Sequence, residues 1–217
     1  MEKKTVIVGA SPFSSMMRAY MEHAGRDVVA YAVESHFRQQ DTFDNRPLID
    51  FEALPRLFPA TQYCILNTIG YVKMNGCRKR LFLQCKEWGY TLVSYIHPSA
   101  MIASPIGDGC IILENCIVGM RNVIGDGCLM YGGVNISHDC LVGDFSYWGP
   151  GAISCGNVVI GSRCFIGAGA ILRNRIQIAE SCLIGAGVFM NHSIEEPNLC
   201  YRAPHPVLHP QKADNLL

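Results

Sequence analysis

Large apolar residues recur at every sixth position between residues 106 and 189. The 84 residues of this stretch divide into fourteen rows of six with no insertion or deletion. The first position of each row is aliphatic or Met except at Trp148 and Ser154, and the second position is Gly in eight rows. The fifth position is small or medium-sized except at Asn122 and Ile176, and six of its members are Cys: Cys110, Cys116, Cys128, Cys140, Cys164 and Cys182.

A period of six fits neither a helix, which repeats near 3.6 residues, nor a single strand, which alternates. It is typical of short strands joined by tight corners, where Gly is expected because it reaches positive φ without steric cost. Three strands and three corners close a triangular coil of 18 residues, and such coils stack as a solenoid. The pattern therefore predicts a parallel β-helix over about residues 100–190 with between four and five coils (84/18). The first-position residues fill its interior.

The residues before the repeat alternate between strand and helix patterns. We expect strands at 5–10, 28–33, 63–67 and 91–95, helices at 11–24, 50–57 and 74–88, and a polar loop up to Pro47. Such alternation predicts a small parallel sheet, a Rossmann-like half. We therefore divide the chain into a Rossmann-like α/β domain (1–97), a β-helix domain (98–192) and a C-terminal extension (193–217).

Charge and cysteine usage limit the possible partners. The 18 basic and 18 acidic residues balance, so we expect no nucleic-acid partner and no anionic membrane surface. No apolar run approaches the roughly 20 residues of a membrane span. The N-terminus leads into an apolar strand without a signal-peptide layout, which favours the cytoplasm. There the eleven cysteines, which include no C-x-x-C pair, are expected to stay reduced and to fill space as small apolar residues.

The six-residue pattern resembles that of the hexapeptide-repeat acyltransferases, whose coils form a left-handed β-helix. The general rule for parallel crossovers would give the opposite hand. A small α/β domain, the segment Ile96-His97-Pro98-Ser99-Ala100 and then hexapeptides resemble one branch, the bacterial sugar acyltransferases. This branch includes sialic acid O-acetyltransferases and N-acetyltransferases of nucleotide-linked 4-amino sugars. The resemblance implies acetyl-CoA as co-substrate and a homotrimer with active sites between subunits.

His138 is the one His of the repeat, and it stands at an outward-pointing corner position followed by Asp139. A solvent-exposed corner His is the simpler interpretation, but the resemblance implies that His138 is a general base. An acceptor must lose a proton as it attacks a thioester, and imidazole suits this task near neutral pH. Asp139 would accept the other ring N–H and fix the tautomer. Gly156 lies eighteen residues on, at the same corner of the next coil, and its N–H matches the amide that stabilises the oxyanion in the family.

The resemblance also implies where the substrates bind. Acetyl-CoA is expected along the outside of the later coils, past Gly156, Gly167, Ala168, Gly185 and Ala186, with Arg202 near a CoA phosphate. No metal is expected, because His205 and His209 are separated by prolines in what reads as a mobile tail.

Three features depart from the family pattern. The first is the segment Tyr201-Arg202-Ala203-Pro204-His205-Pro206, where the family often has a G-x-P-A-K-like sequence near the cofactor. Tyr147 stands where some members have a second His; it can hydrogen-bond an acceptor or the thioester but cannot shuttle a proton at neutral pH. The phosphate loop, commonly G-A-S-G-H-G, reads Gly9-Ala10-Ser11-Pro12-Phe13-Ser14, and Pro12 removes one N–H donor. The hydroxyls of Ser11, Ser14 and Ser15 are expected to replace part of that coordination. The family has an acidic pair after the second strand, and this chain has Val33-Glu34 there, so Glu34 is the acidic residue that remains.

We interpret the chain as an acetyl-CoA-dependent sugar acetyltransferase, acting on the amino group of a nucleotide-linked amino sugar. O-acetylation of a sialic-acid-like or other surface-glycan sugar is the alternative that the altered phosphate loop favours. A zinc carbonic anhydrase on the same helix would need three His, and the repeat has one. A non-catalytic binding module is the third hypothesis, and it predicts that acetyl transfer survives replacement of His138.

Overall fold

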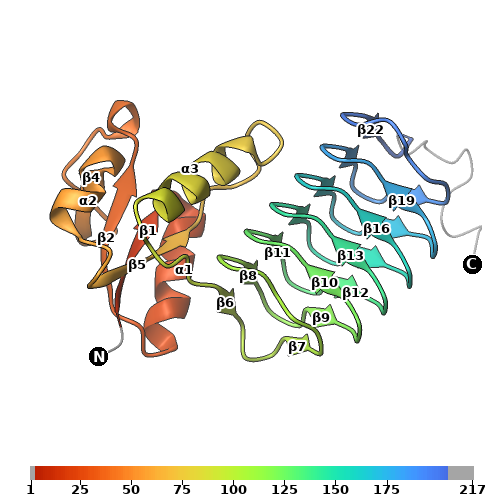
Figure 1. Cartoon of the computed structure of the whole chain (residues 1–217), viewed down its shortest axis with the longest axis horizontal. Helices are drawn as coiled ribbons and strands as arrows, with labels where there is room; N and C mark the ends of the chain where they lie inside the picture. Colours follow the sequence, from red (N-terminus) through yellow and green to blue (C-terminus); the bar gives the residue numbers. More distant parts are fainter. Residues whose placement is uncertain (1–2, 205–217) are drawn as a thin grey trace, which may run out of the picture.

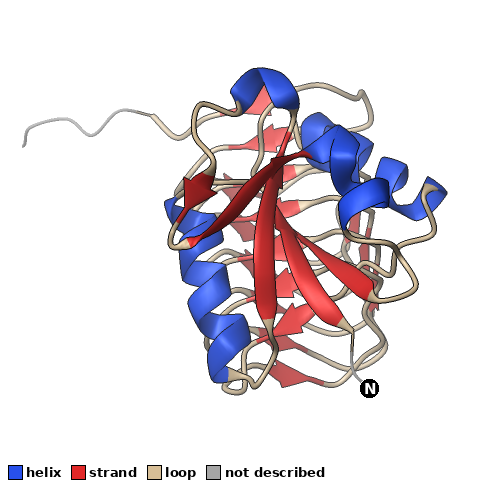
Figure 2. Ribbon diagram, turned by 90° about the vertical axis from the view of Figure 1, so that its left-hand side faces the viewer, coloured by secondary structure: helices blue, strands red, loops and turns tan. Residues whose placement is uncertain are grey.

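The computed structural model describes residues 3–204, which form an α/β sheet packed against one face of a β-helix (Figure 1). The N-terminal sheet has the strand order β3 (Thr42–Phe43), β4 (Arg46–Asp50), β2 (Val28–Val33), β1 (Lys4–Val8) and β5 (Tyr63–Asn67). All pairs are parallel except β3 with β4. Its helices are α1 (Pro12–His23), α2 (Leu54–Leu57) and α3 (Gly76–Glu87), with 3₁₀ turns at Ser35–Phe37 and Phe51–Ala53. Figure 2 looks onto this sheet, with the rungs of the β-helix behind it.

The expected polar loop up to Pro47 is wrong, because this segment forms the hairpin β3–β4. Asp44 and Asn45 make its two-residue turn with φ of 47° and 56°, the conformation of a hairpin turn in which both central residues are left-handed. Pro47 fits because it pairs with the two-residue edge strand β3, where a missing donor costs little. The Asp-Asn pair was the signal in the sequence.

The expected fourth strand at 91–95 shrinks to a single bridge between Leu92 and Ile65. Tyr95 instead opens β6 (Tyr95–Ile96), which pairs with β8 (Ile111–Ile112) as the first rung of the β-helix. The chain has only these few residues in which to leave one sheet and join another, so the strand cannot extend.

The β-helix has three parallel faces with seven, six and four strands. The seven-stranded face lies against the N-terminal domain, and the other two are turned away from it. The strands of the seven-stranded face are β6, β8, β11 (Leu129–Met130), β14 (Tyr147–Trp148), β17 (Phe165–Ile166), β20 (Leu183–Ile184) and β22 (Cys200–Tyr201). The six-stranded face holds β7 (Met101–Ile102), β9 (Ile117–Val118), β12 (Asn135–Ile136), β15 (Ile153–Ser154), β18 (Ile171–Leu172) and β21 (Phe189–Met190). The four-stranded face holds β10 (Val123–Ile124), β13 (Leu141–Val142), β16 (Val159–Ile160) and β19 (Gln177–Ile178).

These faces show that the predicted register is right and the predicted coil count too low. Ile106 bridges to Ile124 on one face, and every later first-position residue is buried in the interior. Strands at both ends, such as β6 and β22, add rungs where the six-residue pattern is lost. Trp148 and Ser154, the two exceptions in the first position, are both fully buried in the same coil. There the small side chain leaves room for the large one.

The recurrence of Gly at the second position of the rows has a different cause from the one expected. The second-position glycines do not have positive φ. A Cβ on Gly143 would lie 2.5 Å from the backbone nitrogen of Ser162 in the next coil, and most of the other second-position glycines face the same contact. Positive φ falls instead on the fourth position of every row, from Gly109 to Gly187, where eight of the fourteen residues are not Gly. Close stacking of coils therefore selects Gly at one position, and the left-handed corner lies at another.

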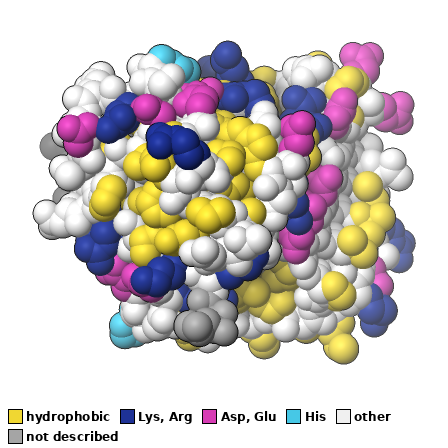
Figure 3. Space-filling model, turned by 60° about the vertical axis from the view of Figure 1, so that its left-hand side comes forward, with side chains coloured by type: hydrophobic (Ala, Val, Ile, Leu, Met, Phe, Trp, Pro, Cys, Tyr) yellow, Lys and Arg dark blue, Asp and Glu magenta, His cyan; other side chains and the backbone are white. Residues whose placement is uncertain are grey.

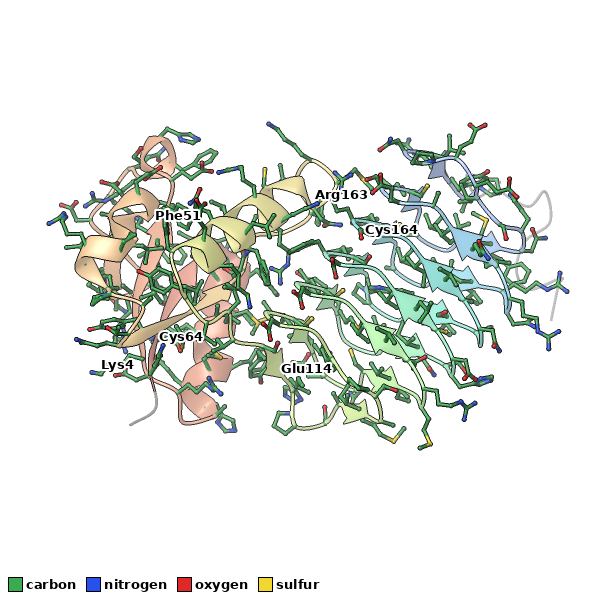
Figure 4. The ribbon with its side chains drawn as sticks, in the orientation of Figure 1. Lys4, Phe51, Cys64, Glu114, Arg163 and Cys164 are labelled. Atoms are coloured by element: carbon green, nitrogen blue, oxygen red, sulfur yellow. The ribbon has the colours of Figure 1, made fainter. Side chains whose placement is uncertain are left out.

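Helix α3 fixes the N-terminal domain to the β-helix. Arg78 is 1% exposed, and its guanidinium donates to four carbonyl oxygens: Gly127 (2.6 Å), Asn67 (2.5 Å), Ile69 (3.1 Å) and Gly109 (3.1 Å). Asn75, just before the helix, donates from Nδ2 to the Cys164 carbonyl at 3.2 Å. Figure 4 shows Cys164 close to this end of α3. Burial lowers the pKa of Arg78 to about 10, so the side chain is still charged at neutral pH.

All eleven cysteines are unpaired thiols in the structure, and those at the fifth row position are buried. None of the helices in residues 3–204 is long and apolar enough to cross a membrane. On the face shown in Figure 3, acidic and basic side chains are interspersed and apolar side chains gather between them.

We predict that Arg78→Met lowers the free energy of unfolding by on the order of 3 kcal/mol or more, because buried carbonyls that lose their donor keep the full desolvation cost. Urea denaturation measures the change. Lys79→Met is the matched control, since Lys79 is the next residue of the same helix and is exposed. Equal stability of the two variants would show that the guanidinium does not join the two parts.

Candidate active site

His138 lies at the corner between β12 on the six-stranded face and β13 on the four-stranded face. Its side chain is 54% exposed, as expected for an outward-pointing third-position residue. The turn that carries it is braced from the preceding coil by Asn122, the polar exception in the fifth position. Asn122 accepts from the Cys140 N–H at 2.7 Å and donates to the Ser137 carbonyl at 2.6 Å. The buried amide therefore fixes the backbone on both sides of His138.

Asp139 accepts a hydrogen bond from the imidazole. His138 Nδ1 lies 2.6 Å from Asp139 Oδ2. Arg121, from the preceding coil, donates from Nε to Oδ1 at 2.6 Å and from Nη2 to Oδ2 at 2.7 Å. Arg121 first, and then His138, hold the pKa of Asp139 well below its usual range. An ionised carboxylate only accepts, so Nδ1 carries the proton and Nε2 of the neutral ring has the free lone pair.

Gly156 lies directly against the imidazole from the next coil. A Cβ on Gly156 would be 2.6 Å from both Cε1 and Nε2 of His138. Its carbonyl accepts from the Arg175 N–H at 3.1 Å, whereas its own N–H donates to nothing among the described residues. The site thus combines a base with a free ring nitrogen and an unpaired backbone donor beside it, which is the arrangement that acyl transfer needs.

Of the expected acetyl-CoA residues, only Gly156 lies beside His138, and four others lie at another corner of the same chain. Gly167 and Ala168 follow β17, and Gly185 and Ala186 follow β20, so the six-stranded face separates them from His138. A Cβ on Gly167 would collide with the backbone of Ala186, so coil stacking alone is sufficient reason for this Gly. Arg202 lies beside Gly185 at the rim of a cavity of about 250 Å³ that Phe189, His192 and Tyr201 also line.

Four of the expected acceptor-binding residues meet in the N-terminal domain. Gly9, Ser11, Ser14 and Glu34 line a cavity of about 450 Å³ at the carboxyl ends of β1, β2 and β5. This is where open parallel sheets bind ligands. Glu34 Oε2 accepts from Arg80 Nη2 at 2.8 Å at one side of the cavity.

The serines of the loop, which are expected to coordinate a phosphate, already have hydrogen-bond partners within the chain. Ser11 and Ser14 form a capping box, in which each backbone N–H donates to the other side chain, at 3.1 and 3.2 Å. The Ser14 hydroxyl also lies 2.8 Å from that of Thr68, and the Ser15 hydroxyl donates to Asp44 Oδ2 at 2.6 Å. These hydroxyls and amides stabilise the start of α1 and are already paired.

Within one copy of the chain, Tyr147 is not a spatial neighbour of His138. It belongs to the seven-stranded face, where its ring stacks on Phe165 at 4.5 Å and meets Tyr71 edge-on at 5.1 Å. Burial, with Tyr131 and Tyr71 nearby, raises the pKa of Tyr147 to about 12. Nine residues are half of an 18-residue coil, so a residue nine positions after His138 must lie on the opposite side of the prism.

The described residues hold no group of three or more His, Cys, Asp and Glu placed to bind a metal ion. His205 and His209, which were expected to lie in a mobile tail, are outside the described residues. Arg121 and Asn122 are the site residues that the sequence reasoning missed. Their spacing of 18 from Asp139 and Cys140 was the available signal.

Comparisons with known proteins agree with this geometry. The family model for the bacterial transferase hexapeptide (six repeats) matches residues 157–192. The acetyltransferase domain of PglB from Neisseria gonorrhoeae, solved with acetyl coenzyme A, is 26% identical with a TM-score of 0.78, over 89% of this chain and 93% of that one. PerB from Caulobacter crescentus, solved with CoA and GDP-perosamine, is 26% identical with a TM-score of 0.77, over 89% and 91%.

WeeI from Acinetobacter baumannii shares the fold at 18% identity, with a TM-score of 0.75 over 88% of this chain and 93% of that one. A comparison with curated protein sequences found no match. The structural likenesses confirm the resemblance to hexapeptide-repeat sugar acetyltransferases. The stacked parallel sheets are consistent with the left-handed β-helix that this resemblance implies.

We predict that Gly156→Ala displaces the His138 ring from Asp139 while the fold is kept, because the added methyl group occupies the space of the imidazole. A crystal structure of the variant measures the His138–Asp139 distance. Gly132→Ala is the control, since Gly132 has the same row position but its nearest neighbour, the Glu114 carbonyl oxygen, is 3.4 Å away. An unmoved imidazole in the Gly156 variant would contradict the prediction.

Proposed function

We propose that the chain is an acetyl-CoA-dependent N-acetyltransferase that acts on the amino group of a nucleotide-linked amino sugar. The observation that carries the proposal is the His138–Asp139 pair stacked on the unpaired Gly156 N–H. Acetyltransferases that are 26% identical and are bound to acetyl-CoA, or to CoA and GDP-perosamine, share the fold around it. Cytoplasmic location and a role in surface-glycan synthesis stay predictions.

The reaction follows from the geometry of the corner. The acceptor amine attacks the thioester carbonyl carbon, and His138 Nε2 removes a proton from the attacking nitrogen. Asp139 keeps the other proton on Nδ1 and stabilises the imidazolium that forms. The Gly156 N–H donates to the tetrahedral oxyanion, which collapses as the bond to the CoA sulfur breaks. The sulfur leaves as thiolate or takes the proton from His138.

The site is completed by a second copy of the chain. Both outer faces that flank His138 carry exposed apolar residues at strand positions, including Val123 and Leu141 on the four-stranded face and Met101 and Phe189 on the six-stranded face. Apolar residues in rows suit a subunit interface. A neighbour packed there brings its own cofactor corner or N-terminal cavity toward His138, which explains why one chain holds these parts separately. We propose a homotrimer.

The N-terminal cavity binds the nucleotide part of the acceptor, and its phosphates contribute little to the affinity. Pro12 has no N–H, and the capping box uses the N–H groups of Ser11 and Ser14. Few donors remain for a diphosphate, although the helix dipole still favours an anion. Recognition of the sugar therefore falls mainly to the surroundings of His138 and the neighbouring subunit.

His138→Ala is expected to lose roughly 10²–10⁴-fold in acetyl-transfer rate, the usual contribution of a general base. Asp139→Asn should lose less, because the imidazole remains and only its orientation suffers. Steady-state assays with acetyl-CoA and a panel of amino and hydroxyl sugars measure both, and His23→Ala on the exposed end of α1 is the control. Unchanged transfer by His138→Ala would remove His138 from the mechanism, and no transfer by the unaltered protein would favour a binding module. Transfer only to hydroxyl sugars would favour O-acetylation.

Calorimetry should show acetyl-CoA binding more tightly than a nucleoside diphosphate such as GDP. Pro12→Gly should raise the affinity for the diphosphate several-fold, because it restores one amide donor at the start of α1. A diphosphate bound tightly by the unaltered chain, with its phosphates on the amides of residues 10–14, would show this interpretation of the loop to be wrong.

Light scattering should give three times the chain mass at working concentration. Leu141→Glu places a charge in the proposed interface and should yield monomers, whereas Leu57→Glu, at an exposed apolar position on α2, should leave the trimer intact. A monomeric unaltered protein would refute the assembly.

A further inference from the structure

The carboxylate that orients His138 is itself held from the preceding coil. Arg121 contacts both oxygens of Asp139, and Oδ2 receives His138 Nδ1 as well as Arg121 Nη2. From this shared oxygen we infer that Arg121 is a positioning residue for the base. It fixes the rotation of Asp139 and offsets its negative charge, which limits how strongly Asp139 favours the protonated imidazole. The inference rests on the proposed function.

The contact is not a by-product of the repeat. Arg163 has the same row position as Arg121 and faces Glu180 on the next coil, yet they meet through a single contact of 3.8 Å. Arg121 instead presents the planar fork of its guanidinium to both carboxylate oxygens, at 2.6 and 2.7 Å. Such two-point pairing fixes the plane of the carboxylate as well as its position. Arg121 thus fixes the side chain of Asp139, whereas Asn122 fixes the backbone on both sides of His138.

The charged and titratable groups near the base are few. Asp139 lies on its own turn and Arg121 on the preceding coil. The next coil contributes Cys155 beside Gly156, and the coil after that carries Arg173 and Arg175 at exposed positions. Among these, Arg121 and Asp139 form the ion pair that directly contacts the imidazole. A change of charge at either position therefore acts on the proton balance of the ring at short range.

The pH profile of kcat/KM separates positioning from mere surface pairing. In Arg121→Gln the Asp139 charge is no longer offset, so the protonated imidazole is favoured. The acidic limb of the profile, where kcat/KM rises with pH as the imidazole loses its proton, should therefore move to higher pH. The expected shift is roughly 0.5 pH unit for such an exposed pair. Asp139→Asn removes the negative charge and should move the limb to lower pH. Arg121→Gln should also lower the plateau of kcat/KM about 3–10-fold, and Arg121→Lys should restore the limb but only part of the plateau.

Two controls make the test specific. In an Asp139→Asn background, Arg121→Gln should lower the plateau no further, because Arg121 positions the base through Asp139. Arg163→Gln removes the same charge from an equivalent row position and should change neither. Melting temperatures of all variants should agree within a few degrees, so that a loss of activity is not a loss of fold.

The inference is overturned if Arg121→Gln leaves the limb and the plateau unchanged, moves the limb in the same direction as Asp139→Asn, or lowers the plateau by its full factor in the Asp139→Asn background. NMR titration of the His138 ring, assigned by its loss in His138→Ala, gives a readout without turnover. The titration midpoint should shift upward in Arg121→Gln. If the unaltered protein transfers no acetyl group, the proposed function fails, while an upward NMR shift would still establish that Arg121 sets the proton balance of His138.

Discussion

The repeat distance between coils is the constraint on which the structure depends. Each coil is hydrogen-bonded to the next along all three faces, so residues 18 apart lie at strand spacing, about 4.7–4.9 Å. At that distance a second-position Cβ such as one on Gly143 would strike the following backbone, and each corner needs one left-handed residue. Interior packing adapts to the same rule, as the small Ser154 beside Trp148 shows.

The same spacing between coils brings together the residues of the candidate active site. Arg121, Asp139 and Gly156 come from three successive coils and converge on His138 without any specialised loop. A rigid scaffold of this kind holds the proposed base, its proposed orienting carboxylate and a backbone donor in fixed geometry before any substrate binds. Preorganised donors of this type cost no reorganisation when charge develops in the transition state.

The N-terminal domain is attached by a buried cation without a carboxylate partner. Arg78 donates to four carbonyl oxygens, two from each side of the boundary. These hydrogen bonds compensate the buried guanidinium for the water that it loses. The attachment holds the cavity at Gly9 and Glu34 in a fixed position relative to the seven-stranded face. The two remaining faces are turned away from this domain, and they are the faces of the proposed subunit interface.

The sequence by itself determined the β-helix, its register and the position of His138 at an outward corner, because a repeat of fixed length places every residue by its number alone. It also placed Gly156 beside His138. Only the tertiary structure decided what depends on side-chain direction and on contacts outside the repeat. These include the two-point contact of Arg121 with Asp139 and the pairing of the loop serines in a capping box. They also include the rungs beyond the pattern, such as β6 and β22, which backbone pairing extends where side chains no longer repeat.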